Sequence, residues 1–200
     1  MNNNKNKKWE DYEGNIPKEQ SYINNKRLRS DLIEWLNNEG WGNALAYTFT
    51  FPSGDKNREW VMNMTKIFFN AIDKKVYGGH SRHRKPRRCQ RINAIEHGAN
   101  NNNYHIHGII KVPSNGFANK AFTNIDRFRL MMGEVWESTV PFNRDITPYR
   151  YQIEEPNNPT LGHSPEQWIT YFSKTMTKLN PEAICLNTLW QCNDDGKSLT

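Results

Sequence analysis

Two histidines, His105 and His107, stand one residue apart in an apolar stretch of the chain. Successive side chains of a β-strand point to opposite faces, so in a strand both imidazoles lie on one face, about 7 Å apart. A carboxylate, Glu96, precedes them across the Asn-rich segment 98–103. Two imidazole nitrogens and one carboxylate oxygen leave positions open for water and substrate, a mixed donor set that suits Mn²⁺ or Mg²⁺ acting on a phosphate. The pattern therefore predicts an open metal site on a β-hairpin.

The third donor of this site is open between Glu96 and its neighbour His97. A hairpin returns the chain beside Glu96, and directly opposite residues of paired strands lie about 5 Å apart. Adjacent residues of one strand face opposite ways, so Glu96 and His97 serve together only if a bulge intervenes. The spacing alone does not decide between them.

A candidate nucleophile follows later in the chain. Tyr171, Lys174 and Lys178 fall at helical spacing, so they share one face of the helix predicted after Ser164. A free tyrosine has a pKa of about 10, and a nearby ammonium favours its phenolate form. We therefore predict Tyr171 as the nucleophile and Lys174 as the residue that orients it or stabilises its charge. The alternative is a tyrosine at the edge of the core beside solvated lysines.

Positive charge is concentrated in one segment of a chain whose formal net charge is +6. Residues 80–91 contain six Lys and Arg side chains, which are Arg82, Arg84, Lys85, Arg87, Arg88 and Arg91. Nucleic acid is the usual partner of such a segment, so we predict that these residues bind DNA. Because the segment leads directly into the strand before the histidines, we expect its charge to lie near the metal site. The alternative is a solvated loop.

Interleaved helices and strands position these residues. Hydrophobic periodicity predicts helices over 26–38, 57–76, 124–137 and 164–179. The last of these begins at Ser164 as N-cap, with Gln167 completing a capping box. Strands are predicted over 44–51, 91–97, 104–112 and 146–153. This order indicates an α+β fold with a mainly antiparallel sheet covered by helices.

The length of 200 residues suits one domain without a second catalytic module. We expect a flexible arm over 1–23, the domain over 24–180 and a tail over 181–200. The sequence has no apolar run of roughly 18 residues and no signal-peptide core near its start, so we expect an intracellular protein without a membrane partner. Its three cysteines lack C-x-x-C spacing, which argues against a structural zinc site.

Three patterns occur in a fixed order: the Thr-rich strand Thr48-Phe49-Thr50, the Glu plus His-x-His-Gly hairpin, and the helical Tyr-x-x-Lys. Together they resemble the motifs of HUH-family single-tyrosine endonucleases, most closely the rolling-circle replication initiators of small plasmids and viruses. The resemblance covers about residues 44–179. It implies that Glu96 rather than His97 completes the metal site. It also implies a five-stranded antiparallel sheet of ferredoxin-like type, although the sequence pattern assigns only four strands.

The chemistry that this resemblance implies is metal-dependent nicking and joining of single-stranded or hairpin origin DNA. Tyr171 would form a covalent 5′-phosphotyrosine, with Mn²⁺ or Mg²⁺ as the cofactor and a host helicase as a further partner. Such an initiator works in the cytoplasm of a bacterial or archaeal host, or in the host nucleus if it belongs to a eukaryotic virus. The alternatives are a transposase or mobilisation relaxase with the same chemistry and a non-catalytic nucleic-acid-binding protein.

Overall fold

The computed structural model describes residues 27, 29–31, 33–35, 37–38, 40–54, 56–82, 87–98, 103–114, 116–141, 150–156 and 164–175. The regular elements in chain order are β1 (Ala44–Thr50), α2 (Arg58–Tyr77), β2 (Arg91–His97), β3 (Tyr104–Lys111), α3 (Ile125–Thr139), β4 (Arg150–Glu154) and α4 (Pro165–Phe172). The described residues between 27 and 38 are helical. The predicted arm over 1–23 and tail over 181–200 lie outside the described residues. Of the helices described, none has the length and apolar character needed to cross a membrane.

The strands form one sheet in the order β2-β3-β1-β4. Every neighbouring pair in it is antiparallel. Because β3 lies between β1 and β2, and β1 lies between β3 and β4, each β-α-β unit is split by a further strand. The predicted α+β class with an antiparallel sheet is confirmed. Among the residues that the structure describes, four strands occur.

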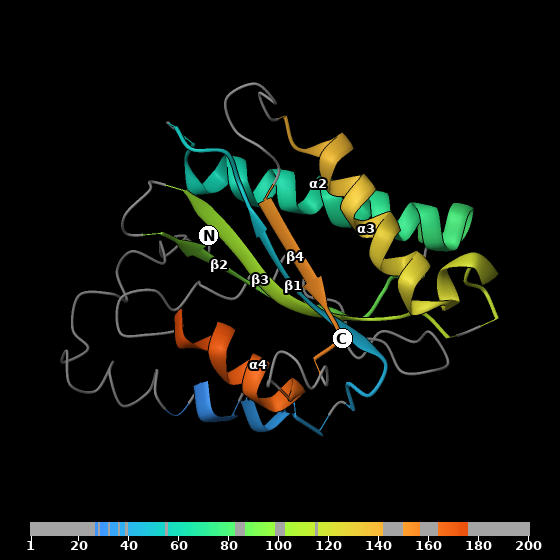
Figure 1. Cartoon of the computed structure of the whole chain (residues 1–200), viewed down its shortest axis with the longest axis horizontal. Helices are drawn as coiled ribbons and strands as arrows, with labels where there is room; N and C mark the ends of the chain where they lie inside the picture. Colours follow the sequence, from blue (N-terminus) through green and yellow to red (C-terminus); the bar gives the residue numbers. More distant parts are fainter. Residues whose placement is uncertain are drawn as a thin grey trace, which may run out of the picture.

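Helices cover both faces of this sheet (Figure 1). α2 and α3 lie on one face, while α4 and the helical residues within 27–38 lie on the other. The larger core is on the α2/α3 face, where the rings of Phe49, Phe68 and Trp136 pack with centroids 4.6 to 5.3 Å apart. The smaller core on the α4 face consists of Trp41, Ala44, Ile92, Ala94, Ile109 and Ile169. Because this core is small, positions on the α4 face of the sheet remain for polar side chains.

Polar side chains fix where the helices begin. Asn57, Asn124 and Ser164 each accept a hydrogen bond from the backbone N–H three residues later. Ser164 and Gln167 form the predicted capping box, in which Ser164 N donates to Gln167 Oε1 over 2.8 Å. α4 passes into a 3₁₀ turn at Ser173–Thr175. The predicted extension to residue 179 lies outside the described residues.

A buried ion pair ties the start of β2 to α2. Arg91 is only 2% exposed, and its two terminal nitrogens donate to the two carboxylate oxygens of Asp73 over 2.9 and 3.0 Å. Its guanidinium also lies over the ring of Phe69. Asp73 accepts a further hydrogen bond from Cys89 N. Because an unpaired buried charge is strongly destabilising, this pair holds β2 in place against α2.

Candidate active site

The register of the hairpin places Glu96 on the same face as the histidines. Glu96 lies directly opposite His105 in the β2–β3 pair, and the pairing runs without a bulge. Glu96, His105 and His107 therefore share the face that α4 covers. His97 pairs with Tyr104, and the two rings pack edge to face on the opposite side with centroids 4.6 Å apart. Of the two alternatives that the spacing left open, the geometry favours Glu96.

Two threonines of β1 hold the histidine rings. Thr48 pairs with His107 and Thr50 with His105 across the β1–β3 ladder. The threonine Oγ1 atoms lie 2.9 and 3.0 Å from the Nδ1 atoms of His107 and His105. When Nδ1 carries the proton and donates it to the threonine, Nε2 keeps the lone pair that a metal ligand needs. The sequence pattern included this strand but did not reveal these two contacts.

The spacing of Glu96 and His107 suits a shared cation. Glu96 Oε2 lies 3.1 Å from His107 Nε2. Two ligands held about 2.1 Å from one ion at a right angle are about 3 Å apart, so this pair fits a divalent cation. The His105 ring stacks on that of His107 with centroids 6.0 Å apart.

The three donors do not yet surround a single point. Within the part of the chain that the structure describes, no three His, Cys, Asp or Glu side chains are grouped closely enough to hold a metal ion as they stand. Completing the set requires a shift of the Glu96 carboxylate or of the His105 ring. The metal role of Glu96, His105 and His107 therefore stays a prediction, which the donor chemistry and the threonine contacts support.

Burial lowers the pKa of both imidazoles. Desolvation lowers the pKa of His107 to about 4; the charges of His105 and Lys174 also lower it, and Glu96 opposes the shift. Desolvation likewise lowers the pKa of His105 against the attraction of Glu96. Neutral rings offer lone pairs at pH 7, which metal binding requires.

Tyr171 reaches this site from α4. Its ring stands edge-on to that of His107, with centroids 5.8 Å apart and an interplanar angle of 89°. Trp168 stacks on Tyr171 at 5.3 Å, and its indole N–H donates to Gly108 O over 2.8 Å. These contacts tie α4 to the histidine strand. Tyr171 remains 43% exposed, so a ligand arriving from solvent can contact it.

Lys174 lies over the face of the Tyr171 ring. Its Nζ is 3.9 Å from the ring centroid, a distance at which the ring attracts the ammonium. The structure therefore brings together the residues that the sequence singled out in two separate segments: the hairpin with Glu96, His105 and His107, and the helix with Tyr171 and Lys174. Lys178 lies outside the described residues.

The basic segment meets β2 at the end away from the site. Arg91 begins β2, whereas Glu96 lies near its other end, and five residues of strand span about 17 Å. The expectation that this segment brings positive charge to the histidines is wrong for the part next to Arg91. Arg91 itself is buried and donates to both carboxylate oxygens of Asp73, so it is not available to a DNA phosphate.

The other basic residues differ in how far the structure describes them. Arg88 donates to Asn70 Oδ1 over 2.8 Å, and Arg87 lies over the Phe117 ring, 3.5 Å from its centroid. The backbone of Arg82 belongs to a 3₁₀ turn. Arg84 and Lys85 lie outside the described residues. DNA binding by Arg82, Arg84, Lys85, Arg87 and Arg88 stays a prediction.

Two glycines allow the site to pack as it does. A Cβ added to Gly108 would lie 2.2 Å from Tyr47 Oη and 2.4 Å from Ile92 O, so no side chain fits there. A Cβ at Gly98 would lie 3.1 Å from Nε2 of His105. In the sequence Gly108 was only part of a motif and Gly98 part of a turn. Their importance depends on contacts with residues that are distant in sequence.

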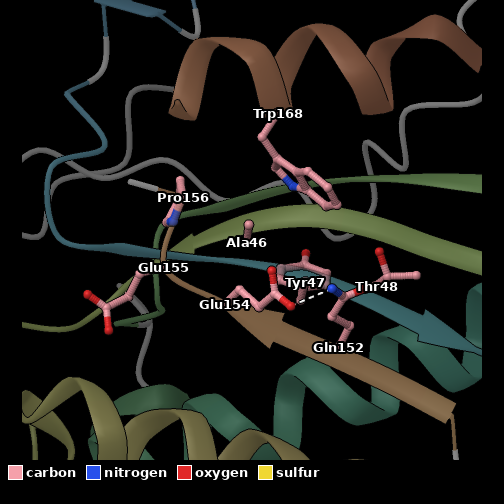
Figure 2. A pocket seen from close by; sticks show the side chains of 8 residues that line it. All are labelled: Ala46, Tyr47, Thr48, Gln152, Glu154, Glu155, Pro156 and Trp168. Carbon is pink, nitrogen blue, oxygen red and sulfur yellow. Dashed lines mark hydrogen bonds between the residues drawn. The ribbon is translucent and has the colours of Figure 1, made fainter. Parts of the chain in front are cut away.

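A pocket of about 30 Å³ adjoins the site between α4 and the strands β1 and β4. Figure 2 shows Trp168 descending from α4 toward the sheet above Ala46. The lining residues are Ala46, Tyr47, Thr48, Gln152, Glu154, Glu155, Pro156 and Trp168. Thr48 links the pocket to the site because it also contacts His107. No sequence pattern indicated this pocket, since three separate segments form it.

This site places two imidazoles and a carboxylate beside a phenol and an ammonium. Such a set can neutralise charge on a phosphate and offer it an oxygen nucleophile. Comparisons of the chain with protein-family models, with curated proteins and with solved structures found no match.

Proposed function

We propose that this protein is a HUH-type single-tyrosine endonuclease that nicks and rejoins single-stranded DNA to initiate rolling-circle replication. The observation that carries the proposal is the contact of the Tyr171 ring with His107, on the face that also presents Glu96 and His105. A tyrosine that only packed at the edge of the core would not need to contact a histidine on the face of Glu96. The split β-α-β order of the sheet supports the ferredoxin-like part of the proposal, which includes a fifth strand.

Glu96, His105 and His107 would hold Mn²⁺ or Mg²⁺. The bound ion would polarise a scissile phosphate and offset the charge that builds on its oxygens. Thr48 and Thr50 contribute by fixing the ring orientation through Nδ1. The low pKa of His107 favours its neutral form at neutral pH, which a metal ligand requires.

Tyr171 would supply the nucleophile. Its phenolic oxygen forms a bond to phosphorus while the bond from phosphorus to the 3′ oxygen breaks, and the phenolic proton ends on that 3′ oxygen. The products are a 5′-phosphotyrosine and a free 3′-hydroxyl. Because the tyrosyl ester replaces the phosphodiester, the reverse step rejoins the strand without ATP. Lys174 stabilises the negative charge of the phenolate from its position over the ring.

Single-stranded or hairpin DNA fits this site better than a duplex. A duplex stacks its bases inside, whereas unpaired bases can stack on an exposed aromatic ring such as Tyr171, beside which the half-buried Trp168 lies. The net charge of +6 favours a polyanion. A host helicase would supply the unwinding of the duplex.

Covalent capture tests the proposal. We expect wild-type protein, incubated with Mn²⁺ and a random-sequence pool of single-stranded DNA, to form an adduct that survives SDS. A label at the 3′ end of the DNA should stay on the protein, and a label at the 5′ end should leave with the free 3′-hydroxyl product. Tyr171→Phe should abolish the adduct. Tyr151→Phe is the matched control, because Tyr151 lies on β4 and is 40% exposed, close to the exposed fraction of Tyr171. An undiminished adduct in Tyr171→Phe would refute the proposal.

The metal donors are tested in the same assay. Glu96→Ala and His105→Ala should each abolish adduct formation while leaving the binding of single-stranded DNA within about twofold of wild type, because they remove metal ligands and not the DNA surface. His97→Ala, on the opposite face, should keep full activity. If only His97→Ala lost activity, the third metal donor would be His97 and the assignment to Glu96 would be wrong.

A further inference from the structure

The pocket between α4 and the strands β1 and β4 (Figure 2) shares Thr48 with the site, because Thr48 also contacts His107. His107 pairs with Thr48, and Thr48 pairs with Gln152, so the three form one row across β3, β1 and β4. Neighbouring strands are about 4.8 Å apart, which puts the Gln152 backbone about 10 Å from that of His107. A DNA strand crossing the sheet from the site would meet this pocket next.

One carboxylate faces the pocket. Glu154 is half-buried, and its Oε1 accepts a hydrogen bond from Gln152 Nε2. The carboxylate of Glu155 turns away from the other lining side chains, as Figure 2 shows, and it pairs with Arg129 over 2.7 Å. A carboxylate repels phosphate, so Glu154 does not fit a site for the DNA backbone. It fits a group that donates N–H bonds.

An aromatic side chain and two small ones line the part of the pocket that faces α4. Trp168 forms one wall, and its position is fixed by the hydrogen bond to Gly108 and by stacking on Tyr171. Ala46 and Thr48, both small, form the floor below it. A flat group can therefore enter edge-first beside the indole and reach Glu154. Base stacking on aromatic rings is a common mode of single-strand binding.

We propose that this pocket binds the base of a nucleotide next to the scissile phosphate, and that it prefers adenine, cytosine or guanine to thymine. The proposal rests on the proposed nicking function for the position of that phosphate. The three preferred bases carry an exocyclic amine that can donate to Glu154. On thymine, the ring N–H lies between two carbonyl oxygens, which the carboxylate repels. Gln152 holds Glu154 in place and has its own amide available to the base.

Binding of homopolymers tests the preference without cleavage. Fluorescence anisotropy would measure the affinities of oligo(dA), oligo(dC) and oligo(dT) for Tyr171→Phe protein in EDTA. In that background we expect Glu154→Leu to weaken oligo(dA) and oligo(dC) binding about tenfold and to leave oligo(dT) binding unchanged or stronger. Glu154→Gln, which keeps the side-chain shape, should give a smaller change in the same direction. Glu155→Leu is the matched control and should leave the ratio of the affinities unchanged.

Two results would overturn the inference. One is an equal change for all three homopolymers in Glu154→Leu, because the carboxylate would then act only through its charge on the DNA backbone. The other is the absence of single-strand binding by the Tyr171→Phe protein.

The adduct assay separates this inference from the proposed function. If wild-type protein forms the adduct but Glu154 does not affect the base ratio, the pocket proposal fails and the nicking proposal stands. If no adduct forms but the base ratio depends on Glu154, a base-binding pocket stands and the nicking proposal fails.

Discussion

Each imidazole in the site is held by a hydroxyl on one nitrogen and is partly withdrawn from water. Thr48 and Thr50 contact the Nδ1 atoms, and burial lowers the pKa of both rings. These two features distinguish His105 and His107 from exposed histidines that share a strand face by chance. Both features have consequences for metal binding that single substitutions and pH can measure.

Thr48→Val should weaken Mn²⁺ binding about 10- to 100-fold, because it removes the hydrogen-bond partner of His107 Nδ1 and keeps the branched shape that suits a strand. Isothermal titration calorimetry would measure the affinity. Thr65→Val is the control, since Thr65 is a buried threonine of α2 that bonds Val61 O. An unchanged affinity in Thr48→Val would mean that the hydroxyl does not orient the ring.

Mn²⁺ binding should also resist mild acid. Metal ligands must be deprotonated, and imidazoles with the ordinary pKa of about 6.5 would each cost about tenfold in affinity at about pH 5.5. Because the pKa of His107 is lowered to about 4, its imidazole should contribute little to the loss at about pH 5.5, and the lowered pKa of His105 should reduce the contribution of that ring as well. We expect the calorimetric affinity at about pH 5.5 to be within about tenfold of that at about pH 7.5. A loss of about a hundredfold would contradict the buried, neutral state.

Residue types and spacing were enough to select His105, His107, Tyr171 and Lys174 from the sequence, because strand and helix periodicity decide which side chains share a face. Spacing left Glu96 and His97 as alternatives, and only the resemblance to HUH-family endonucleases favoured Glu96. The roles of Thr48 and Thr50 depend on the register between β1 and β3, which segments far apart in the chain establish. The prediction for Arg91 overlooked an ion-pair partner that is distant in sequence. Its charge indicated DNA binding, but Asp73, on a helix earlier in the chain, binds it in the interior.

At the scale of elements, Gly108 connects the histidine strand both to its neighbouring strands and to α4. Gly108 permits Tyr47 Oη and Ile92 O to come within reach of its Cα, and its carbonyl accepts the indole N–H of Trp168. The same residue therefore lets the strands pack and fixes the helix that presents Tyr171.

Gly108→Ala should destabilise the fold by about 3 kcal/mol, because the new methyl group overlaps a backbone oxygen that has no room to move. Urea unfolding followed by circular dichroism would measure the change. Gly116→Ala serves as the control, since a Cβ there meets nothing within 4 Å. Equal stability of the two variants would show that the β2–β3 ladder can relax around the methyl group.

Element boundaries were predicted well where local chemistry sets them. The helix predicted over 57–76 is α2, Arg58–Tyr77, with Asn57 as its cap, and the capping box at Ser164 begins α4 as expected. β4, Arg150–Glu154, overlaps the predicted strand over 146–153, whose first four residues lie outside the described residues. The order of the strands depends on contacts between distant segments, so the sequence left it open.

At the scale of the whole molecule, the larger hydrophobic core and the candidate site lie on opposite faces of the sheet. One face packs against α2 and α3 and contains the larger core, while the other presents Glu96, the histidines and α4. The basic segment joins β2 at Arg91, whereas Glu96 of the candidate site lies near the other end of the same strand. A DNA strand that contacts both would have to cross the length of β2.

The central claim is that the hairpin and α4 form one reactive site. Mass spectrometry of the protein after reaction with Mn²⁺ and single-stranded DNA, followed by nuclease and protease digestion, tests it most directly. We predict a nucleotide attached through phosphate to the peptide that contains Tyr171, and to that tyrosine within it. A nucleotide on any other residue, or none in a preparation that binds both Mn²⁺ and DNA, would contradict the account.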